Sequence, residues 1–429
     1  MFSEWIRKIG FYTIDAIRGG HILKHYKDIS KKMNGEVDPL DELPKILSYA
    51  KENVPYYSNI KGDELRDFPV INKSDIMANY DSFISREYSN TKNLHWVSTS
   101  GSTGTPFKAC QDARKRNRTI ADLIYFHKLN GWELGDRYVF LRAWTSSYSV
   151  SKLKLCLQNF IPIDVINFDD KAKESLRQML KKDKKIRVIL GYASALQDFV
   201  NYLEQKGDNS SMFNIKVIFS VSDNLSNLTK QKLEKMFACP VINRYSNEEH
   251  GVLACTSKSS DKFILNTASY YFELLKLDVD EPVGPGEIGR IVVTDLYNRS
   301  MPFIRYDTGD LAISDDKDRN HIKTLSSLQG RVADTITDTK GNLISAVVLN
   351  NHLNNYYKIK KYQLVQDDKN SYVFKVVCSK DSYNSDELIE VCKSFLGEEA
   401  KVKIEYLDEI PIEHTGKFKT VVNCYRTKL

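Results

Sequence analysis

The sequence predicts an α/β protein. We expect a large N-terminal domain, built on doubly wound mixed sheets with a small antiparallel sheet or barrel, and a small α+β C-terminal domain. Between residues 94 and 255, short apolar runs alternate with stretches of helical period. Residues 262–315 change to a period of two, and a strand, strand, helix, strand pattern follows residue 331. These three patterns place the domains at residues 1–330 and 331–429.

Residues 1–90 read as helices with polar connections. They end in a turn-rich passage at residues 68–73. Asn72 or Ser74 is suited to cap the helix that follows. Near the start, Trp5, Ile9, Tyr12 and Ala16 recur at helical spacing. This stripe permits peripheral contact with a membrane surface, but we favour packing against the body of the protein itself.

The middle of the chain predicts a largely parallel sheet. Apolar runs suited to strands occupy residues 138–141, 188–191, 215–221 and 240–243, and amphipathic helical stretches occupy residues 173–180, 195–203 and 229–237. Strands that alternate with helices in this way are joined by crossover connections and pair in parallel.

The remaining strands predict two smaller sheets. Alternating segments at 263–265, 270–277 and 289–295, with a Gly-Pro-Gly turn at 284–286, favour antiparallel pairing. Beyond Gly330-Arg331, strands at 372–378 and 401–406 flank a helix at 385–396, which is a natural size for a separate lobe.

The net charge does not by itself imply a polyanionic partner. The net charge of +6 is a small difference between 62 basic and 56 acidic residues. Basic runs at residues 114–118 and 181–187 lack the interleaved aromatic residues of a base-stacking surface, so we interpret both as solvated faces. No nucleic-acid partner is predicted.

Cysteine usage and hydropathy predict a cytoplasmic protein. The seven cysteines are scattered and form no CxxC pair, which is typical of reduced thiols. Cys239, His250 and Cys255 lie close in sequence but lack a fourth zinc ligand. Charged residues interrupt the first thirty positions, and no stretch is long enough to be a transmembrane segment.

The segment at residues 98–108, STSGSTGTPFK, carries the strongest chemical signal. It follows a strand-like run at 94–97, and its hydroxyls, glycines and backbone N–H groups are suited to surround phosphate oxygens. It is not a P-loop, because Lys108 is neither preceded by glycine nor followed by Ser or Thr.

This segment resembles the TSGTTGxPK phosphate loop of the adenylate-forming superfamily, which contains acyl-CoA synthetases, adenylation domains and luciferases. Residues 243–251 (NRYSNEEHG) resemble its YGxTE element, 305–311 (RYDTGDL) its YRTGDL element, and 411–417 (PIEHTGK) its PxxxxGK element. The four elements stand in the family's order. Gly330-Arg331 resembles the start of its hinge element. Most relatives have an acid or a lysine two residues after the arginine, whereas this chain has Ala333 at that position and Asp334 at the next one.

The resemblance implies a role for each matching residue. Tyr245 packs on adenine, Asp310 holds the ribose hydroxyls, Glu249 binds Mg²⁺ and Lys417 enters the site during adenylation. The catalytic residues are then Lys417, Glu249 and Thr103. The implied ATP-binding residues are Thr99, Ser100, Gly101, Ser102, Thr103, Gly104, Lys108, Asp223, Tyr245, Ser246, Asn247, Asp310 and Arg331.

Within the superfamily, the chain resembles the phenylacetate-CoA ligase and CapK-like capsular-polysaccharide branch. The matching segments are 53–57 (NVPYY), 68–75 (FPVINKSD) and 298–306 (NRSMPFIRY). The resemblance implies ATP-dependent activation of a carboxylate, then acyl transfer to the thiol of coenzyme A or to an amine. It also implies a mobile C-terminal domain. Tyr138, Trp144 and Ser222 are candidates for the carboxylate pocket.

Two other functional classes are compatible with the same loop. A kinase would use it to hold ATP but would release ADP, and a degenerate nucleotide-binding scaffold would retain the fold without catalysis. The extra acid Glu248 beside Glu249 favours the scaffold, whereas the joint presence of Glu249, Asp310, Arg331 and Lys417 favours a working ligase.

Overall fold

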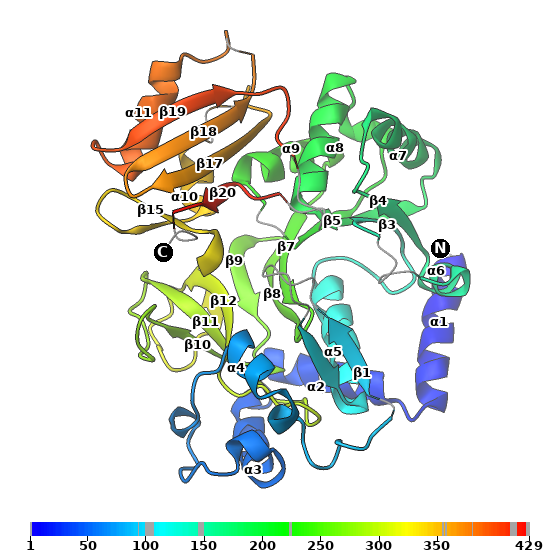
Figure 1. The fold of residues 1–429 in the computed structure, drawn as a ribbon. Helices are drawn as coiled ribbons and strands as arrows, with labels where there is room; N and C mark the ends of the chain where they lie inside the picture. Colours follow the sequence, from blue (N-terminus) through cyan, green and yellow to red (C-terminus); the bar gives the residue numbers. More distant parts are fainter. Residues whose placement is uncertain are drawn as a thin grey trace. The chain divides into compact units, whose positions relative to one another are not determined.

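The computed structural model describes residues 2–92, 94–98, 107–144, 150–222, 225–353, 356, 358–379, 381–411 and 418–425. The chain forms two compact units (Figure 1). The first consists of Met1–Asp136 and Ile242–Ser327, and the second of Arg137–Val241 and Leu328–Leu429. The boundary expected at residue 330 stays a prediction.

The first unit begins with helices joined by polar turns, as predicted. Its α-helices are α1 (Phe2–Ile17), α2 (His21–Met33), α3 (Leu43–Asn53), α4 (Lys73–Ala78) and α5 (Ala113–Leu129), and its 3-10 helices are η1 (Pro39–Glu42), η2 (Pro55–Tyr57), η3 (Leu65–Asp67) and η4 (Tyr80–Phe83). The Asn72 side chain accepts hydrogen bonds from the backbone N–H groups of Ser74 and Asp75, which confirms the expected N-cap of α4.

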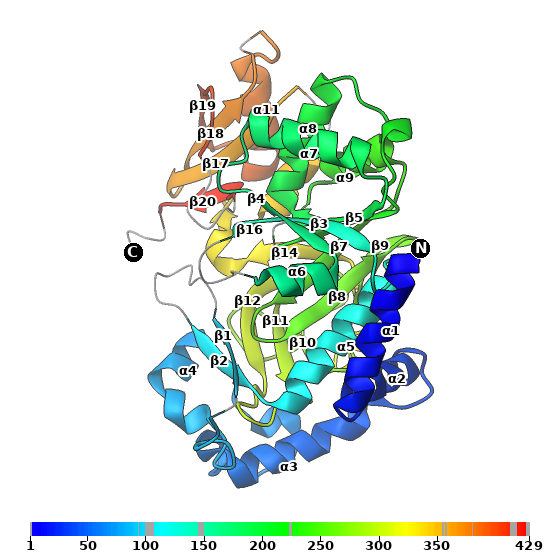
Figure 2. The same cartoon turned by 90° about the vertical axis from the view of Figure 1, so that its right-hand side faces the viewer.

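Helix α1 exposes the apolar face that we expected to be packed. Trp5 is 60% exposed and Ile9 is 44% exposed. Asp15 is buried, and its carboxylate accepts hydrogen bonds from the N–H groups of Ile22 and Leu23 at 3.0 and 2.9 Å. The packing prediction was wrong. Helix α1 lies beside α2 (Figure 2) and is joined to its start by this polar contact of Asp15, whereas Trp5 and Ile9 stay exposed. No described helix is long and apolar enough to cross a membrane.

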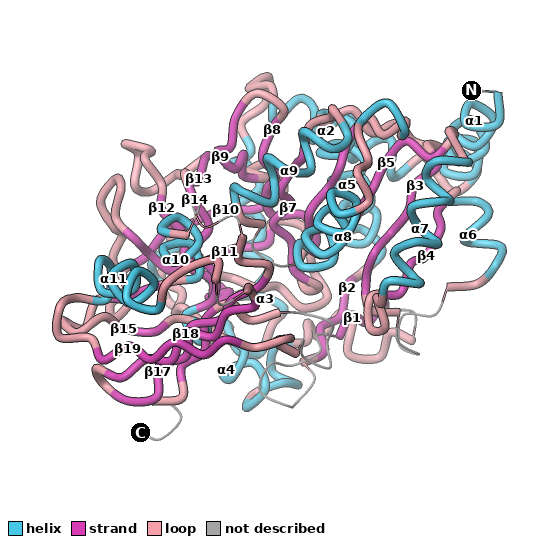
Figure 3. The backbone as a smooth tube through the Cα atoms, turned by 90° about the horizontal axis from the view of Figure 1, so that it is seen from above, coloured by secondary structure: helices cyan, strands magenta, loops and turns pink. Residues whose placement is uncertain are grey.

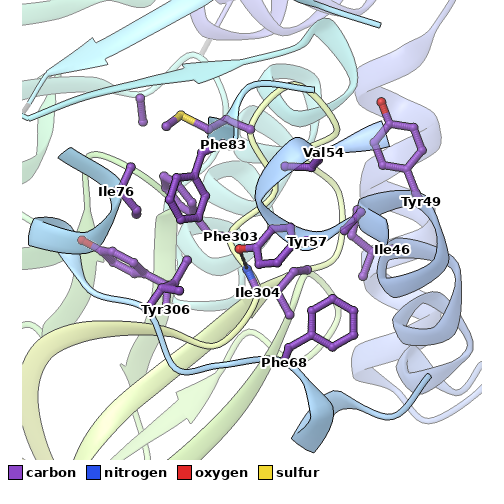
Figure 4. Packing of buried hydrophobic residues seen from close by; sticks show 14 of the residues in the cluster. Ile46, Tyr49, Val54, Tyr57, Phe68, Ile76, Phe83, Phe303, Ile304 and Tyr306 are labelled. Carbon is purple, nitrogen blue, oxygen red and sulfur yellow. Dashed lines mark hydrogen bonds between the residues drawn. The ribbon is translucent and has the colours of Figure 1, made fainter. Parts of the chain in front are cut away.

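A buried aromatic cluster links the N-terminal helices to a segment much later in the sequence (Figure 4). Tyr57 lies within 5.8 Å of Phe83, centroid to centroid, and both are fully buried. The Tyr57 hydroxyl accepts a hydrogen bond from the N–H of Ile304 and donates one to the carbonyl of Pro302, each at 3.3 Å.

This cluster gives the branch-specific sequence segments a shared structural role. Residues from 53–57, 68–75 and 298–306 all belong to it. Burial of such side chains contributes about 25 cal/mol per Å² of apolar surface. The apolar residues of these three segments therefore share one core of the first unit.

The strands of the first unit pair antiparallel. They are β1 (His95–Ser98), β2 (Lys108–Gln111), β7 (Val241–Asn247), β8 (Gly251–Ser257), β9 (Ser260–Leu265), β10 (Tyr270–Leu275), β11 (Ile288–Asp295), β12 (Tyr306–Ile313) and β13 (Thr324–Leu325). β1 pairs with β2, β9 joins β8 to β13, and β11 lies between β10 and β12. The expected antiparallel sheet is confirmed.

The second unit contains the predicted parallel sheet, in the order β6-β5-β3-β4. Its elements are β3 (Arg137–Arg142), α6 (Lys152–Gln158), β4 (Phe160–Asp164), α7 (Asp170–Lys182), β5 (Ile186–Tyr192), α8 (Ala193–Gln205), η6 (Ser210–Met212), β6 (Val217–Val221) and α9 (Asn227–Phe237). Helix α8 packs on β3, β5 and β6 between α7 and α9. The strand order reverses at β3, because β4 lies on one side of it and β5 on the other. Open α/β sheets typically bind ligands at such a reversal, beyond the carboxyl ends of the strands.

The C-terminal part of the second unit has the predicted strand, strand, helix, strand order. It contains β14 (Ser327–Arg331), η7 (Val332–Asp334), β15 (Ile336–Thr337), β16 (Leu343–Ile344), α10 (Ala346–His352), β17 (Lys361–Asp368), β18 (Ser371–Val377), α11 (Ser385–Leu396), β19 (Lys401–Tyr406) and β20 (Val421–Asn423). Figure 3 shows β17, β18 and β19 side by side in a sheet of order β19-β18-β17-β20. Its apolar core includes Leu364, Phe374 and Leu388.

The two basic runs have different environments. Lys182, Lys184 and Lys185 are exposed, as expected of a solvated face. In the other run, Lys115 and Arg118 are fully buried, so the solvated-face interpretation of residues 114–118 was wrong. Both side chains reach acidic partners supplied by distant parts of the first unit, which compensates the cost of burying their charge.

Candidate active site

Two residues from separate sequence motifs meet in the first unit. Tyr245 lies on β7 and Asp310 on β12, and the tyrosine hydroxyl donates a hydrogen bond of 2.7 Å to the Asp310 carboxylate. Both side chains are half-buried. The contact joins positions 65 residues apart, so it arises from the fold and not from local sequence.

Thr308 supports this pair, although it was not among the predicted site residues. Its hydroxyl donates to the carbonyl of Ile291 at 3.0 Å and accepts the backbone N–H of Asp310 at 3.2 Å. It also lies 3.4 Å from the Tyr245 hydroxyl. The signal was a hydroxyl two residues before the aspartate, a spacing at which Ser and Thr shape turns.

The other residues of the second motif form the end of β7 and a tight turn. Ser246 and Asn247 are the last residues of β7, with a register shift between Tyr245 and Ser246. A bulge of this kind changes the direction of nearby side chains, and bulges are common next to active sites. Glu249, in the turn, is only 7% exposed, and its carbonyl accepts a hydrogen bond of 3.0 Å from the Gln111 amide.

Gly251 ends the turn where a side chain has no room. Its φ of +95° is accessible mainly to glycine. A Cβ atom at this position would lie 2.6 Å from Cγ2 of Thr119. Glycine therefore permits the close approach of α5 to the turn that carries Glu249.

His250, in the same turn, is fully buried. Burial lowers its pKa to about 3, so the imidazole is neutral at physiological pH. Its ring lies within 6 Å of the rings of Tyr270, Phe303 and Tyr306. From the sequence, His250 was a candidate only for a zinc site, and its aromatic environment was not evident.

The predicted phosphate loop joins two paired strands. β1 and β2 pair antiparallel, with Ser98 opposite Lys108. The ends of the loop therefore lie next to each other, and Lys108 is exposed at the first position of β2. Thr99, Ser100, Gly101, Ser102, Thr103 and Gly104 lie outside the described residues, as do Asp223 and Lys417.

The candidate pocket residues belong to the second unit. Tyr138 and Trp144 lie near opposite ends of β3, yet both rings stack on Phe160, at centroid distances of 5.3 and 5.8 Å. Trp144 also donates its indole N–H to the carbonyl of Phe140 at 3.3 Å. The Trp144 indole is therefore held by stacking in an aromatic layer on β3 and β4.

Ser222 and Arg331 lie at two other places in the second unit. Ser222 follows the carboxyl end of β6 and has a φ of +77°. Non-glycine residues with positive φ are uncommon and concentrate at functional sites. Arg331 is exposed at the end of β14, immediately before η7. The roles of Tyr138, Trp144, Ser222 and Arg331 stay predictions.

The turn at residues 248–249 has suitable donors for the implied Mg²⁺. Glu248 is exposed and Glu249 is buried, so two adjacent carboxylates stand in different environments. Mg²⁺ is typically held by one or two carboxylates while phosphate and water complete its octahedron, so this donor set fits. In the described part of the chain, no three His, Cys, Asp or Glu residues form a metal-binding group by themselves.

Comparison with known proteins finds similarity to CapK. Residues 336–424 match the family described as the CapK C-terminal domain. Protein CapK of Staphylococcus aureus is 25% identical over 430 residues, which cover 93% of this chain and 92% of that protein.

Solved structures with the same fold include several ligases. A 2-hydroxyisobutyryl-CoA ligase in the postadenylation state, in complex with R3-HIB-AMP, aligns with a TM-score of 0.70 at 18% identity, over 90% of this chain and 88% of that one. The anthranilate-CoA ligase AuaEII with anthranoyl-AMP aligns with a TM-score of 0.56 at 14% identity, over 76% and 66%. ATP-bound MatB from Rhodopseudomonas palustris aligns with a TM-score of 0.55 at 15% identity, over 76% and 66%. These matches confirm the predicted fold class, which is that of the solved ligases, and the resemblance of the sequence to CapK.

Proposed function

We propose that this chain, with its adenylate-forming fold and CapK-like sequence, is an AMP-forming carboxylate ligase. It activates a carboxylate as an acyl-adenylate, releases pyrophosphate and transfers the acyl group to a second substrate. The observation that carries this proposal is the 2.7 Å hydrogen bond between Tyr245 and Asp310. Two residues assigned to adenine and to ribose are thereby neighbours, as a single nucleoside requires.

The first unit supplies the nucleoside-binding groups. The Tyr245 ring packs on adenine, and its hydroxyl orients the Asp310 carboxylate, whose oxygens accept the two ribose hydroxyls. Ser246 and Asn247 lie on the same strand, so β7 presents several adenosine-binding groups from one rigid element.

The phosphates are held by the loop between β1 and β2. Residues 99–104 and Lys108 donate to the phosphate oxygens, and Thr103 contacts the group that leaves. Glu249, with Glu248 beside it, would hold Mg²⁺. The bound ion supplies positive charge that offsets the negative charge of the triphosphate. Asp223 is the proposed acidic neighbour of adenine.

In the first step, a carboxylate oxygen attacks the α-phosphorus and forms a mixed anhydride. The bond between that phosphorus and the bridging oxygen breaks, and pyrophosphate leaves with the electron pair. Lys417 stabilises the charge that develops, while the fold aligns nucleophile and leaving group. In the second step, a nucleophile attacks the acyl carbon, loses its proton and displaces AMP.

We propose that residues 331–429 form the mobile domain. A lysine on a mobile lobe enters for adenylation and leaves for transfer, which makes room for the acceptor and limits hydrolysis of the adenylate. Arg331 contacts ribose at the pivot, and Ala333 or Asp334 accommodates the backbone rotation. Tyr138, Trp144 and Ser222 line the carboxylate pocket of the second unit.

Coenzyme A is the first proposed acceptor. The structural relatives named as CoA ligases support a thiol. The match to protein CapK supports an alternative, in which an amine accepts the acyl group during surface-polysaccharide assembly. In either case we place the reaction in the cytoplasm, where ATP is available and the seven free cysteines stay reduced.

Pyrophosphate exchange tests the activation step. Labelled pyrophosphate is expected to enter ATP only when a suitable aryl acid, uronic acid or amino acid is present. Trials with coenzyme A and with amines then identify the acceptor. Release of ADP would instead indicate a kinase, and ATP binding without exchange across all acids would indicate a nucleotide-binding scaffold.

Tyr245→Phe is expected to raise the KM for ATP about tenfold with a smaller change in kcat. It removes the donor that orients Asp310, and a hydrogen bond to a charged group contributes on the order of 1.5 kcal/mol. Tyr362→Phe is the matched control, because it removes a hydroxyl that bonds to Asn350 at the same distance of 2.7 Å in the C-terminal lobe. Equal changes in both variants would contradict the role of Tyr245.

A further inference from the structure

Asn247 and His250, the first and last residues of the turn at 247–250, contact each other twice. Asn247 Oδ1 accepts one hydrogen bond from the His250 backbone N–H at 2.8 Å and has a second contact with His250 Nδ1 at 3.1 Å. Because an amide oxygen can only accept a hydrogen bond, this contact places the proton on Nδ1. His250 therefore binds one oxygen through two donors, and Glu248 and Glu249 lie inside the loop that this contact closes.

The imidazole is held in one orientation by its surroundings. It is fully buried among the rings of Tyr270, Phe303 and Tyr306. Packed interiors leave little space for a side chain to change rotamer. The donor at Nδ1 is thus fixed in direction, and so is the Asn247 oxygen that it contacts.

A second anchor reaches the turn from the interior of the unit. The Tyr270 hydroxyl donates a hydrogen bond to the carbonyl of His250. That hydroxyl accepts one from Lys115 Nζ at 2.8 Å, and Lys115 Nζ lies 2.6 Å from the carboxylate of Asp295. Lys115 and Asp295 are at most 1% exposed. The chain of contacts runs from a buried ion pair on α5 and β11 to the backbone of the turn.

A third anchor binds the adjacent peptide. The Gln111 amide, at the end of β2, donates to the carbonyl of Glu249 at 3.0 Å. The carbonyls of Glu249 and His250 are therefore both held, by donors from different elements. The two backbone contacts and the Asn247–His250 contact determine the path of the turn through Glu249.

We propose that His250 and Tyr270 are positioning residues that hold Glu249 in the geometry required to bind the metal of a metal–ATP complex. This inference rests on the proposed function. Groups that orient a metal ligand change metal affinity by about 10–100-fold when they are replaced. Neither side chain is the ligand; each acts through the backbone or through Asn247.

Calorimetric titration with ATP, in Mg²⁺ and separately in EDTA, tests this inference. His250→Leu is expected to weaken Mg·ATP binding about 10–100-fold and the binding of metal-free ATP much less, because the metal ligand is displaced while β7 still holds Tyr245 and Ser246. Tyr270→Phe keeps the ring and removes the hydroxyl. It is therefore also expected to lower the ratio of Mg·ATP affinity to metal-free ATP affinity. His250→Asn is expected to restore most of the affinity, since its amide places a donor near the Nδ1 position.

A control variant and two contrary outcomes distinguish a failure of the positioning role from a failure of the proposed function. His25→Leu removes a different imidazole of the first unit, which is partly buried and contacts the Tyr297 ring, and it is expected to leave the ratio of Mg·ATP affinity to ATP affinity unchanged. A lower melting temperature with an unchanged ratio in His250→Leu and Tyr270→Phe would overturn the positioning role. If the unsubstituted protein shows no preference for Mg·ATP, the proposed function itself is contradicted.

Discussion

Lys417→Ala is expected to slow adenylation by a factor of about 100 or more, which corresponds to about 3 kcal/mol of transition-state stabilisation. The lysine is proposed to act only while the α-phosphate is attacked. Transfer of the acyl group from a preformed adenylate should therefore change much less. Single-turnover measurements of pyrophosphate release and of acyl transfer, made separately, give the two factors.

The control for Lys417→Ala is Lys403→Ala, in the same lobe. Lys403 is 71% exposed and pairs with Glu405 at 2.8 Å. Exposed pairs contribute little to stability, so this variant reports the effect of removing a lysine from the lobe surface. If Lys417→Ala slows both half-reactions by the same factor, the lobe does not exchange between two positions in the way proposed.

Lys115→Met is expected to lower the free energy of unfolding by about 3–5 kcal/mol. Methionine fills a similar volume but leaves the carboxylate of Asp295, which is 1% exposed, without its 2.6 Å partner. An uncompensated buried charge is far more costly than the loss of one contact. Denaturant unfolding followed by fluorescence or circular dichroism gives the change.

Two further variants separate charge from packing. Lys115→Met combined with Asp295→Asn should regain most of the loss, because the asparagine oxygen still accepts the N–H groups of Tyr297 and Asn298 without a charge. Lys45→Met breaks an exposed pair with Glu42 and should cost at most about 1 kcal/mol. A loss of similar size in Lys115→Met and Lys45→Met would show that the buried pair contributes no more than a surface pair.

Periodicity predicted the secondary structure well because it depends on nearby residues. The helices expected at 173–180, 195–203 and 229–237 lie within α7, α8 and α9, and the helix at 385–396 has the bounds of α11. Side chains of one helical face recur every three or four residues, so their pattern is visible in a short window. The N-cap at Asn72 is local for the same reason.

The candidate site was predictable to the extent that it lies in contiguous motifs. Tyr245 and Asp310 were named from separate segments, and the structure brings them to 2.7 Å. Thr308 and Gln111 were missed, since a single hydroxyl or amide has no periodic signal. Their roles depend on partners at Ile291 and Glu249, which neither motif specifies.

The sequence by itself determined the order of the motifs, the α/β class and most helix and strand positions, because local periodicity and short-range hydrogen bonds encode them. Only the tertiary structure decided that Lys115 is buried, that Trp5 is exposed and that His250 closes a turn. Lys115 meets Tyr270 across 155 residues of sequence, so no local pattern distinguishes it from a solvated lysine. The free energy of a buried charge depends on partners that only the fold brings near.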